Sequence, residues 1–253
     1  MTTTSTRAGS VASTISFSNV DGPGNRFVVF LQGCNFDCVA CHNPQTIPVF
    51  QQVVHGDGHE RARYQRSVDE VLAEIRRAAP FISGITVSGG EAMLQPEFVR
   101  DLFTAVKADP TLQRLTCYVD SNGSCDDATW DVVTAVTDGT MIDLKCFDDT
   151  IHREMTGQSN GPVLRSIERL QSMGLLHEVR LLVLAGVNDD NALLHRTGEW
   201  LAAIDPHMRL KVIGFRAHGA RPHDPPLVEP TAERRQAIAD LLHTIAPFDI
   251  CVV

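Results

Sequence analysis

Three cysteines stand close together near the start of the chain, within the stretch Gln32 to Asn43. Cys34, Cys38 and Cys41 have the spacing C-x3-C-x2-C, and they follow a short apolar run that we expect to be a strand. Cysteine thiolates hold iron–sulfur clusters, which usually take four of them. Because three thiolates leave one iron with an open position, where a substrate or cofactor can bind, the spacing predicts a cluster that takes part in chemistry.

A zinc site is the competing interpretation of the same stretch. Cys34, Cys38, Cys41 and His42 offer a Cys3His ligand set, which would make the chain a zinc-binding structural or interaction protein. Cys41 and His42 are adjacent, so both side chains cannot easily face one ion. A zinc site would also leave unexplained the polar residues that follow the other expected strands, and the cluster is therefore favoured.

Polar residues also stand at the ends of several short β-branched stretches. They are Gly89, Gly90 and Glu91 after 82–88, Asp120, Ser121, Asn122 and Gly123 after 115–119, Asp143 and Lys145 at 140–144, Arg180 in 179–184, and Arg216 and His218 after 210–215. In barrels of alternating strands and helices the active site lies at the carboxyl ends of the strands. Each group has a plainer explanation, namely a turn at 89–90, an Asx turn at 120–123 and an ion pair between Asp143 and Lys145. Their coincidence at one rim with the cysteines indicates a site.

The elements that would position these residues alternate along the chain. Strands are expected at 26–31, 82–88, 115–119, 140–144, 179–184, 210–215 and 249–253, and helices at 96–107, 126–136, 162–173, 191–204 and 232–245. Ser67 and Glu70 form the capping box of one further helix. Such alternation predicts a parallel sheet with helical crossovers. We therefore expect an α/β fold, an open partial (β/α)6 TIM-like barrel with N-terminal and C-terminal extensions.

The composition is that of a globular protein. The chain has 253 residues, of which 43% are hydrophobic and 21% charged, and its net charge of −9 includes no basic block. This charge argues against nucleic acid as the partner. No apolar run approaches the length of a membrane span. The Thr/Ser-rich residues 1–13 lack a secretory signal, so we expect a disordered tail there and a single core domain over 14–253.

The remaining cysteines indicate a reducing compartment. Seven cysteines are an odd number, and Cys117, Cys125, Cys146 and Cys251 are scattered. A secreted disulfide framework is therefore not expected, and a cytoplasmic location fits better. These four residues are interpreted as small core side chains. Residues 47–65 show no periodicity. His55 and His59 within them could bind a metal ion, but a solvated loop is the favoured interpretation.

Five motifs together resemble those of the radical S-adenosylmethionine (SAM) enzymes and, within them, the activases of glycyl radical enzymes. The resemblance runs from Ser16 to the C-terminus, and it is carried by 20–26 (Val-Asp-Gly-Pro-Gly-Asn-Arg), the cysteine spacing with His42-Asn43, 88–92 (Ser-Gly-Gly-Glu-Ala), 120–123 and 143–145. Residues 81–95 and 115–123 are most similar to the YjjW-type activases. Those proteins carry a ferredoxin-like insert with extra C-x2-C pairs, whereas residues 47–65 contain no cysteine. The resemblance implies the radical SAM type of open partial barrel.

The resemblance implies one [4Fe–4S] cluster, held by Cys34, Cys38 and Cys41, whose open iron binds the amino and carboxylate groups of SAM. It implies that Gly89 and Gly90 allow close backbone approach and that Glu91 accepts from the methionine amino group. The other SAM contacts that it implies are Asn43, Asp120, Lys145, Arg180, and either Arg216 or His218. The last two are two residues apart and would share one face of a strand. The family usually has an aromatic residue at the position of Ala40, so adenine is expected to stack elsewhere.

The resemblance also implies a monovalent cation beside SAM. Its ligands would be Asp120, Ser121, Met141 and Asp143. Asp143 would then be an oxygen ligand of a hard cation, and not a partner of Lys145.

The implied activity is the reductive cleavage of SAM to methionine and a 5′-deoxyadenosyl radical, which takes a hydrogen atom from a glycine of a partner enzyme. Asp21, Gly22 and Gly24 would line the mouth where the glycine loop enters. The expected partners are a glycyl radical enzyme and, as electron donor, a flavodoxin or ferredoxin, with the activase a cytoplasmic monomer working without oxygen. The alternative is a radical SAM enzyme that acts on a small molecule or another peptide.

Overall fold

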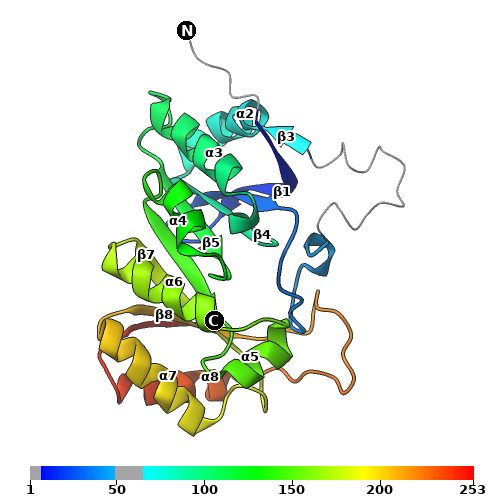
Figure 1. Cartoon of the computed structure of the whole chain (residues 1–253), viewed down its shortest axis with the longest axis vertical. Coiled ribbons are helices and arrows are strands. Elements are labelled where there is room, and N and C mark those ends of the chain that lie inside the picture. Colours follow the sequence, from blue (N-terminus) through cyan, green and yellow to red (C-terminus); the bar gives the residue numbers. More distant parts are fainter. Residues whose placement is uncertain (1–6, 49–64) are drawn as a thin grey trace. The chain divides into compact units, whose positions relative to one another are not determined.

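The structure is a computed structural model that describes residues 7–48 and 65–253, and it divides into two compact units (Figure 1). Unit 1 comprises Met1–Asn35, Gln45–Ser121 and Cys125–Thr140, and unit 2 comprises Phe36–Pro44, Asn122–Ser124 and Met141–Val253. The chain passes from unit 1 to unit 2 within strand β6 (Gly139–Leu144). The expected single core domain over 14–253 stays a prediction.

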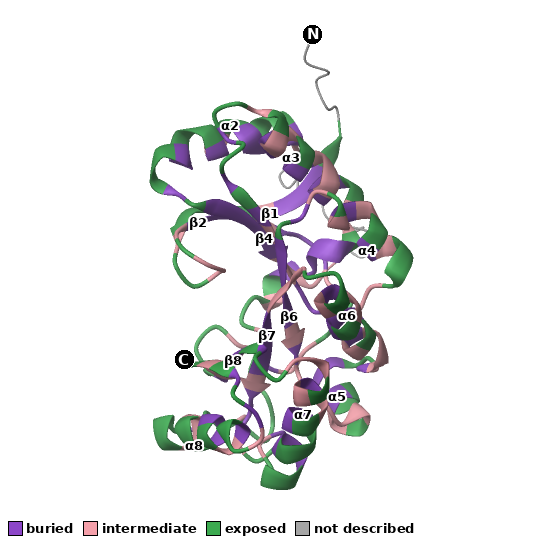
Figure 2. Cartoon of the chain, turned by 90° about the vertical axis from the view of Figure 1, so that its left-hand side faces the viewer, coloured by how far each residue is buried: buried purple, intermediate pink, exposed green. Residues whose placement is uncertain are grey.

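Unit 1 is built on a sheet in which parallel and antiparallel pairs occur together. Its strands are β1 (Ala8–Ser18), β2 (Arg26–Leu31), β3 (Gln65–Ser67), β4 (Gly84–Gly89) and β5 (Thr116–Ser121), in the order β3-β1-β2-β4-β5. The pairs β2–β4 and β4–β5 are parallel, whereas β1 runs antiparallel to β2 and β3. Strands β2 and β4 are buried along nearly their whole length (Figure 2), as expected for parallel strands covered on both faces.

The helices of unit 1 bury apolar faces spaced at the helical period. They are α2 (Val68–Ala78), α3 (Pro96–Ala108) and α4 (Asp127–Thr134), with the short 3-10 helices η3 (Ala79–Phe81) and η4 (Ala92–Leu94). Helix α2 begins with the predicted capping box, in which Ser67 and Glu70 satisfy each other's backbone amides. Val71, Leu72 and Ile75 form its buried face. A further 3-10 helix, η1 (Pro44–Thr46), follows the cysteines.

Unit 2 follows the strand–helix alternation that the sequence predicts. Its strands after β6 are β7 (Leu176–Val183), β8 (Arg209–Gly214) and β9 (Asp249–Val252), and its helices are α5 (Asp149–Thr156), α6 (Gly161–Ser172), α7 (Asn191–Ile204) and α8 (Ala232–His243). The pairs β7–β8 and β8–β9 are parallel. The described strands form no closed barrel, so the α/β fold with an open sheet is confirmed.

One expectation about local structure is wrong, and one helix was not predicted. Residues 8–13 are not part of a tail, because strand β1 begins at Ala8 and pairs with β2 and β3. The β-branched residues of the whole strand, Val11, Thr14 and Ile15, favour this conformation. Helix α5 was not expected, because its polar sequence has few apolar residues to reveal a period. The tail residues 1–6 and the histidines His55 and His59 lie outside the described residues.

Candidate functional site

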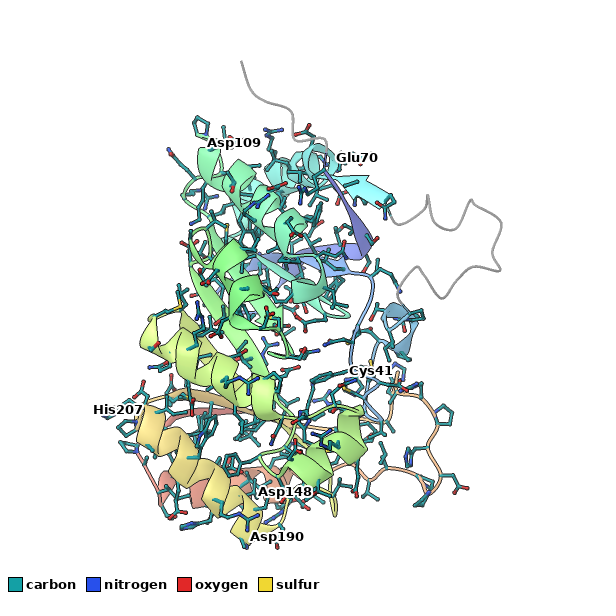
Figure 3. All side chains as sticks on the ribbon, in the orientation of Figure 1. Cys41, Glu70, Asp109, Asp148, Asp190 and His207 are labelled. Atoms are coloured by element: carbon teal, nitrogen blue, oxygen red, sulfur yellow. The ribbon has the colours of Figure 1, made fainter. Side chains whose placement is uncertain are left out.

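The cysteine loop, residues 33–43, is held at its start by unit 1. The amides of Gly33 and Cys34 donate to the carbonyls of Thr46 (2.8 Å) and Ile47 (3.0 Å). In unit 2 the amide of Cys41, labelled in Figure 3, donates to the carbonyl of Cys38 at 3.2 Å and closes a turn. Cys34, Cys38 and Cys41 form no disulfide and have intermediate exposure. The loop therefore offers three sulfur donors within eight residues.

Helix α5 supports the unit 2 part of this loop. The amides of Asp37 and Val39 donate to the carbonyls of Thr156 (3.0 Å) and Met155 (2.9 Å). The last carbonyls of a helix have no hydrogen-bond partner within the helix. The amides of the loop supply these partners, and the same hydrogen bonds hold the loop against the end of α5. The buried ring of Phe36 packs edge to face on His152 of α5, with centroids 5.6 Å apart.

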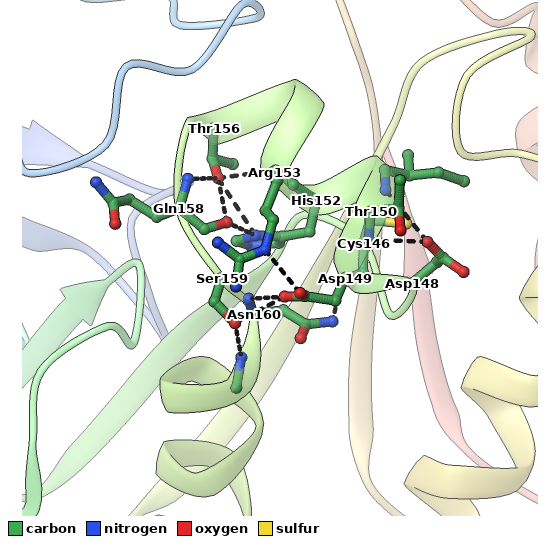
Figure 4. A network of polar contacts seen from close by, with 12 residues as sticks. Cys146, Asp148, Asp149, Thr150, His152, Arg153, Thr156, Gln158, Ser159 and Asn160 are labelled. Atoms are coloured by element: carbon green, nitrogen blue, oxygen red, sulfur yellow. Dashed lines mark hydrogen bonds and ion pairs between the residues drawn. The ribbon is translucent and has the colours of Figure 1, made fainter.

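A polar network holds α5 in place (Figure 4). Asp148 caps the helix by accepting from the amides of Thr150 (3.0 Å) and Ile151 (3.2 Å). Asp149 accepts from the Ser159 hydroxyl at 2.7 Å and the Asn160 amide at 2.9 Å, and it pairs with Arg153 at 2.7 Å. The hydrogen bonds from the Arg153 and Ser159 side chains and the Asn160 amide lower the pKa of Asp149 to about 2.

His152 is a neutral member of this network. Its Nδ1 lies 2.8 Å from the carbonyl of Gln158, so Nδ1 carries the proton and donates. Its Nε2 is buried and has no hydrogen-bond partner in the described part of the chain. Burial lowers the pKa of His152, although the Gln158 carbonyl opposes the shift. No sequence signal identified this residue, because the helix that carries it was not expected.

The chemistry of the three thiols fits a cluster. Burial raises the pKa of the Cys38 thiol to about 11, Lys145 opposes the shift, and Cys41, Asp143 and Asp37 add to it. Binding of a metal ion such as iron would release the proton of this thiol at a much lower pH, since metal binding and deprotonation are coupled. Residues 7–48 and 65–253 contain no preformed group of three His, Cys, Asp or Glu side chains able to hold a metal ion. The fit therefore rests on the donor set, which is three cysteine thiols on one short loop.

The glycines of unit 1 allow a close approach within the chain itself. Gly89 has φ +122°, and a Cβ on it would lie 2.1 Å from the amide nitrogen of Leu31. A Cβ on Gly90 would lie 2.1 Å from the carbonyl oxygen of Gly33. The Glu91 amide donates to that same carbonyl at 2.7 Å. These residues therefore fix the start of the cysteine loop, and their expected contact with SAM stays a prediction.

The side chain of Glu91 is buried and accepts two hydrogen bonds within unit 1. It is 3% exposed, and its Oε1 accepts from the Ser121 hydroxyl at 2.7 Å and the Met93 amide at 2.9 Å. Asp120 instead accepts from the Ser88 hydroxyl at 2.9 Å. Because Asp120 and Ser121 are successive in β5, their side chains point to opposite faces. Their joint role as cation ligands stays a prediction.

Asn122 forms the Asx turn that was one of the two explanations for residues 120–123. Its Oδ1 accepts from the amide of Ser124 at 2.9 Å, and the side chain is buried. Gly123, at φ +72°, completes the turn.

Asp143 and Lys145 form an ion pair in unit 2. The Lys145 Nζ lies 2.8 Å from Asp143 Oδ2. The expectation that Asp143 is not a partner of Lys145 is therefore wrong, because Lys145 directly follows β6, which ends at Leu144, and its long side chain reaches the Asp143 carboxylate. Burial acts to raise the pKa of Asp143, but Lys145, Arg180 and Lys211 outweigh it and lower that pKa.

Arg180 lies among buried groups of unit 2. It is 8% exposed, pairs with Glu178 at 2.9 Å, and donates to the Met141 sulfur at 3.0 Å. Met141 itself is fully buried. The expected roles of Arg180 toward SAM and of Met141 toward a cation stay predictions.

Arg216 and His218 lie beyond the sixth parallel strand and not on it. Strand β8 ends at Gly214, and both residues are exposed in the following segment. The argument that they share a strand face is therefore wrong. Asn43, the remaining SAM contact implied by the resemblance, is also exposed.

Ala40 has a clear structural role. It is buried in an apolar cluster of unit 2 with Met155, Leu184, Leu193, Phe215 and Cys146. The ring of Phe215 also stacks on His42, with centroids 6.0 Å apart and 15° between the planes. The position before the third cysteine therefore faces the core and presents no ring to a ligand.

Asp21, Gly22 and Gly24 lie in the loop before β2, in unit 1. The carbonyl of Asp21 accepts from the Thr86 hydroxyl of β4 at 2.7 Å. Gly24 has φ +71°, and a Cβ on it would lie 2.3 Å from the hydroxyl of Ser83. The loop is therefore packed on β4, and its role at a substrate mouth stays a prediction.

Asn188 is a further residue that sequence reasoning missed. Its buried amide donates to the carbonyls of Lys145 (2.7 Å) and Leu182 (2.6 Å) and accepts from the Leu184 amide (2.8 Å). It thereby joins the carboxyl ends of β6 and β7. Its position just after a strand was the only signal that could have found it.

Comparisons with known proteins identify the family of this chain. The model of the radical SAM superfamily matches residues 28–196. Pyruvate formate-lyase 1-activating enzyme of Escherichia coli strain K12 is 37% identical over 217 residues, which are 83% of this chain and 82% of that protein. A protein of Haemophilus influenzae named as a glycyl-radical enzyme activating enzyme is 32% identical over 228 residues, 82% of each chain.

Solved structures agree with these relatives. A domain of pyruvate-formate lyase-activating enzyme from Bacteroides vulgatus matches with a TM-score of 0.53 and 25% identity, covering 67% of this chain and 99% of that one. QueE from Escherichia coli matches with a TM-score of 0.60 and 12% identity, covering 97% and 94%; this likeness shows the fold alone. In the part of the chain that the structure describes, no helix is long and apolar enough to cross a membrane.

Proposed function

Because the chain belongs to the radical SAM superfamily and, within it, to the activating enzymes of glycyl radical enzymes, we propose that it converts a glycine of a partner enzyme into a glycyl radical. One observation carries this proposal: the C-x3-C-x2-C cysteines lie on one short loop inside the matched region and form no disulfide. The family uses a [4Fe–4S] cluster and SAM. Together they supply the reductive cleavage of the S–C5′ bond, which yields methionine and a 5′-deoxyadenosyl radical able to take the glycine hydrogen.

Some residues of this chain would bind the cluster and SAM, and others would hold the binding residues in position. Cys34, Cys38 and Cys41 would hold the cluster, and α5 would keep the last two in place through Asp37 and Val39. The SAM contacts proposed are Asn43, Gly89, Gly90, Glu91, Asp120, Lys145, Arg180, and Arg216 or His218. The hard radical chemistry belongs to the cofactors, and the protein contributes orientation and exclusion of water.

We also propose that a monovalent cation binds beside SAM. Asp120, Ser121, Met141 and Asp143 are its proposed ligands. The support is the chemistry of the side chains, because the carboxylates of Asp120 and Asp143 and the hydroxyl of Ser121 are oxygen donors of the kind that hard cations take. Occupation by a cation would replace the Lys145 ion pair and release Lys145 for the carboxylate of SAM.

The partner is proposed to be a glycyl radical enzyme, with Asp21, Gly22 and Gly24 at the entry of its glycine loop. A flavodoxin or ferredoxin is proposed as the electron donor, and the activase is proposed to act as a monomer. All seven cysteines lie in the described residues and none forms a disulfide, which fits a reducing compartment such as the cytoplasm.

Anaerobic purification tests the cluster. Wild-type protein is expected to contain iron and sulfide and, after reduction, to cleave SAM. Cys38→Ala should lose both properties, whereas Cys251→Ala, a change at an exposed cysteine of the same unit, should keep them. A colourless wild-type protein that contains zinc and no iron would refute the proposal.

The partner requires a second experiment. The activase, SAM and a reductant are incubated with a glycyl radical enzyme encoded beside it, and electron paramagnetic resonance is recorded. A glycyl doublet on the partner supports the activase. SAM cleavage driven by a small molecule, with no doublet on any such partner, would favour a different radical SAM enzyme.

A further inference from the structure

The segment that follows β8, residues 215–230, lies along the cysteine loop within unit 2 and is drawn in orange in Figure 1. Besides the stacking of Phe215 on His42, the Nε2 of His42 lies 2.7 Å from the carbonyl of Arg216. Ala220 packs against the apolar cluster that contains Ala40 and Phe215. The segment therefore touches the loop at several points between the second cysteine and the residue after the third.

Arg221 makes the polar contacts of this segment with the loop. One nitrogen of its guanidinium lies 2.6 Å from the Asp37 carboxylate, 3.0 Å from the carbonyl of Cys38 and 3.4 Å from the carbonyl of Asp37. This nitrogen carries two N–H groups, so it can donate to two of these acceptors at once, and the delocalised charge of the guanidinium stays next to the Asp37 carboxylate. Arg221 thus holds both peptide groups that flank the alpha carbon of Cys38.

The segment is fixed at both of its ends, so Arg221 is not on a free arm. The amide of Ala217 donates to the carboxylate of Glu229 at 2.8 Å. Further along, the Ala185 amide donates to the carbonyl of Val228 at 3.3 Å, which ties the segment to the loop after β7. These contacts close residues 217–229 into a loop that contains Arg221.

The charge at this place bears on the reduction of a cluster bound to Cys38. Reduction adds one negative charge, and the Asp37 carboxylate, one residue before the ligand, disfavours it by repulsion. The potential of an iron–sulfur cluster depends on the net charge and the hydrogen bonds around it. A cation paired with Asp37 therefore makes reduction easier, although both side chains are partly exposed and water screens the effect.

We propose that Arg221 is a positioning residue for the cluster, which fixes the backbone around Cys38 and raises the reduction potential by compensating Asp37. The inference rests on the proposed function, since it requires the cluster at the three cysteines. It assigns to the segment after β8 a role in setting how readily the external donor reduces the enzyme.

The test is a redox titration of the reconstituted full-length protein, followed by electron paramagnetic resonance of the reduced cluster. Arg221→Gln is expected to shift the midpoint potential to a more negative value, Asp37→Asn to a more positive one, and the double variant to return near wild type. Arg221→Lys should give a smaller shift than Arg221→Gln. The matched control is Arg209→Gln, because Arg209 forms an equally exposed pair with Asp249 elsewhere in unit 2, at 2.7 Å.

An Arg221→Gln midpoint equal to that of Arg209→Gln would overturn the inference, as would a double variant as negative as Arg221→Gln alone. If Arg221→Gln does not retain its cluster, Arg221→Lys and Asp37→Asn decide, and shifts in the same direction would refute the proposal. Wild-type protein without iron and sulfide would instead refute the proposed function. A normal cluster that is insensitive to Arg221 would refute only this inference.

Discussion

Phe36 and His152 pack edge to face, with ring centroids 5.6 Å apart and 81° between the ring planes. Phe36 stands between the first and second cysteines, and His152 lies in the middle of α5. Both side chains are buried. This contact, with the two hydrogen bonds beside it, makes the position of two cysteines depend on a helix more than a hundred residues later in the sequence.

Phe36→Ala is expected to destabilise the protein and to reduce its iron content. Removing a buried phenylalanine ring costs about 3–5 kcal/mol, and the loop loses its packing on α5. The measurements are urea unfolding and iron per chain after anaerobic reconstitution. The control is Phe17→Ala, because Phe17 is half exposed in unit 1. Equal iron content in both variants would contradict the dependence on α5.

His152 predicts a pH dependence of stability. Its pKa in the folded protein is below the ordinary 6.5, so the unfolded chain binds a proton that the folded chain does not. This contribution is fully present above pH 6.5 and is lost as the pH falls from there toward the folded pKa. His152→Gln should flatten the unfolding free energy in that window, whereas His207→Gln, at an exposed turn, should not. Equal slopes in His152→Gln and wild type would refute this account.

Arg26 is expected to be a main contributor to the stability of unit 1. Its fully buried guanidinium donates to Thr86 Oγ1 (3.1 Å), Thr116 Oγ1 (2.6 Å) and the Ile85 carbonyl, and it lies 4.5 Å from the centroid of Tyr118. Burial lowers its pKa to about 10, against the influence of Tyr118 and Cys117.

Arg26→Met should therefore lower the free energy of unfolding by at least about 3 kcal/mol, because it leaves several buried acceptors without a donor. Arg76→Met is the matched change, since Arg76 is half exposed in the same unit and pairs with Asp109 at 2.8 Å; we expect about 1 kcal/mol or less there. Denaturant unfolding measures both. Losses of similar size would show that burial at Arg26 is unimportant.

Gly90→Ala is expected to disturb the start of the cysteine loop. The added Cβ would lie 2.1 Å from the Gly33 carbonyl oxygen, and overpacking of this kind costs about 1–3 kcal/mol. Cluster content and thermal unfolding should both fall. At Gly161 the same change meets its nearest atoms at 3.5 Å, so Gly161→Ala should be nearly neutral. A Gly90→Ala variant that behaves like Gly161→Ala would contradict the close packing.

Parts of the site could be predicted because their signals are local. The three cysteines, the glycines at 89–90 and the capping box at Ser67 each depend on residues a few positions apart, so a single sequence displays them. Asp143 and Lys145 were also found together, but the sequence allowed two explanations. The structure shows the ion pair, at 2.8 Å.

The sequence by itself determined the family, the alternation of strands and helices, and the residues that can carry the chemistry, because residue type and short spacing encode these properties. Only the tertiary structure decided what supports the cysteine loop. Asp37 and Arg221 are separated by 184 positions. Phe36 contacts His152 of α5, a helix that has too few apolar residues for its helical period to be recognised in the sequence. Contacts of this kind form only when the fold brings distant segments together, and local patterns of residues do not predict which distant segments meet.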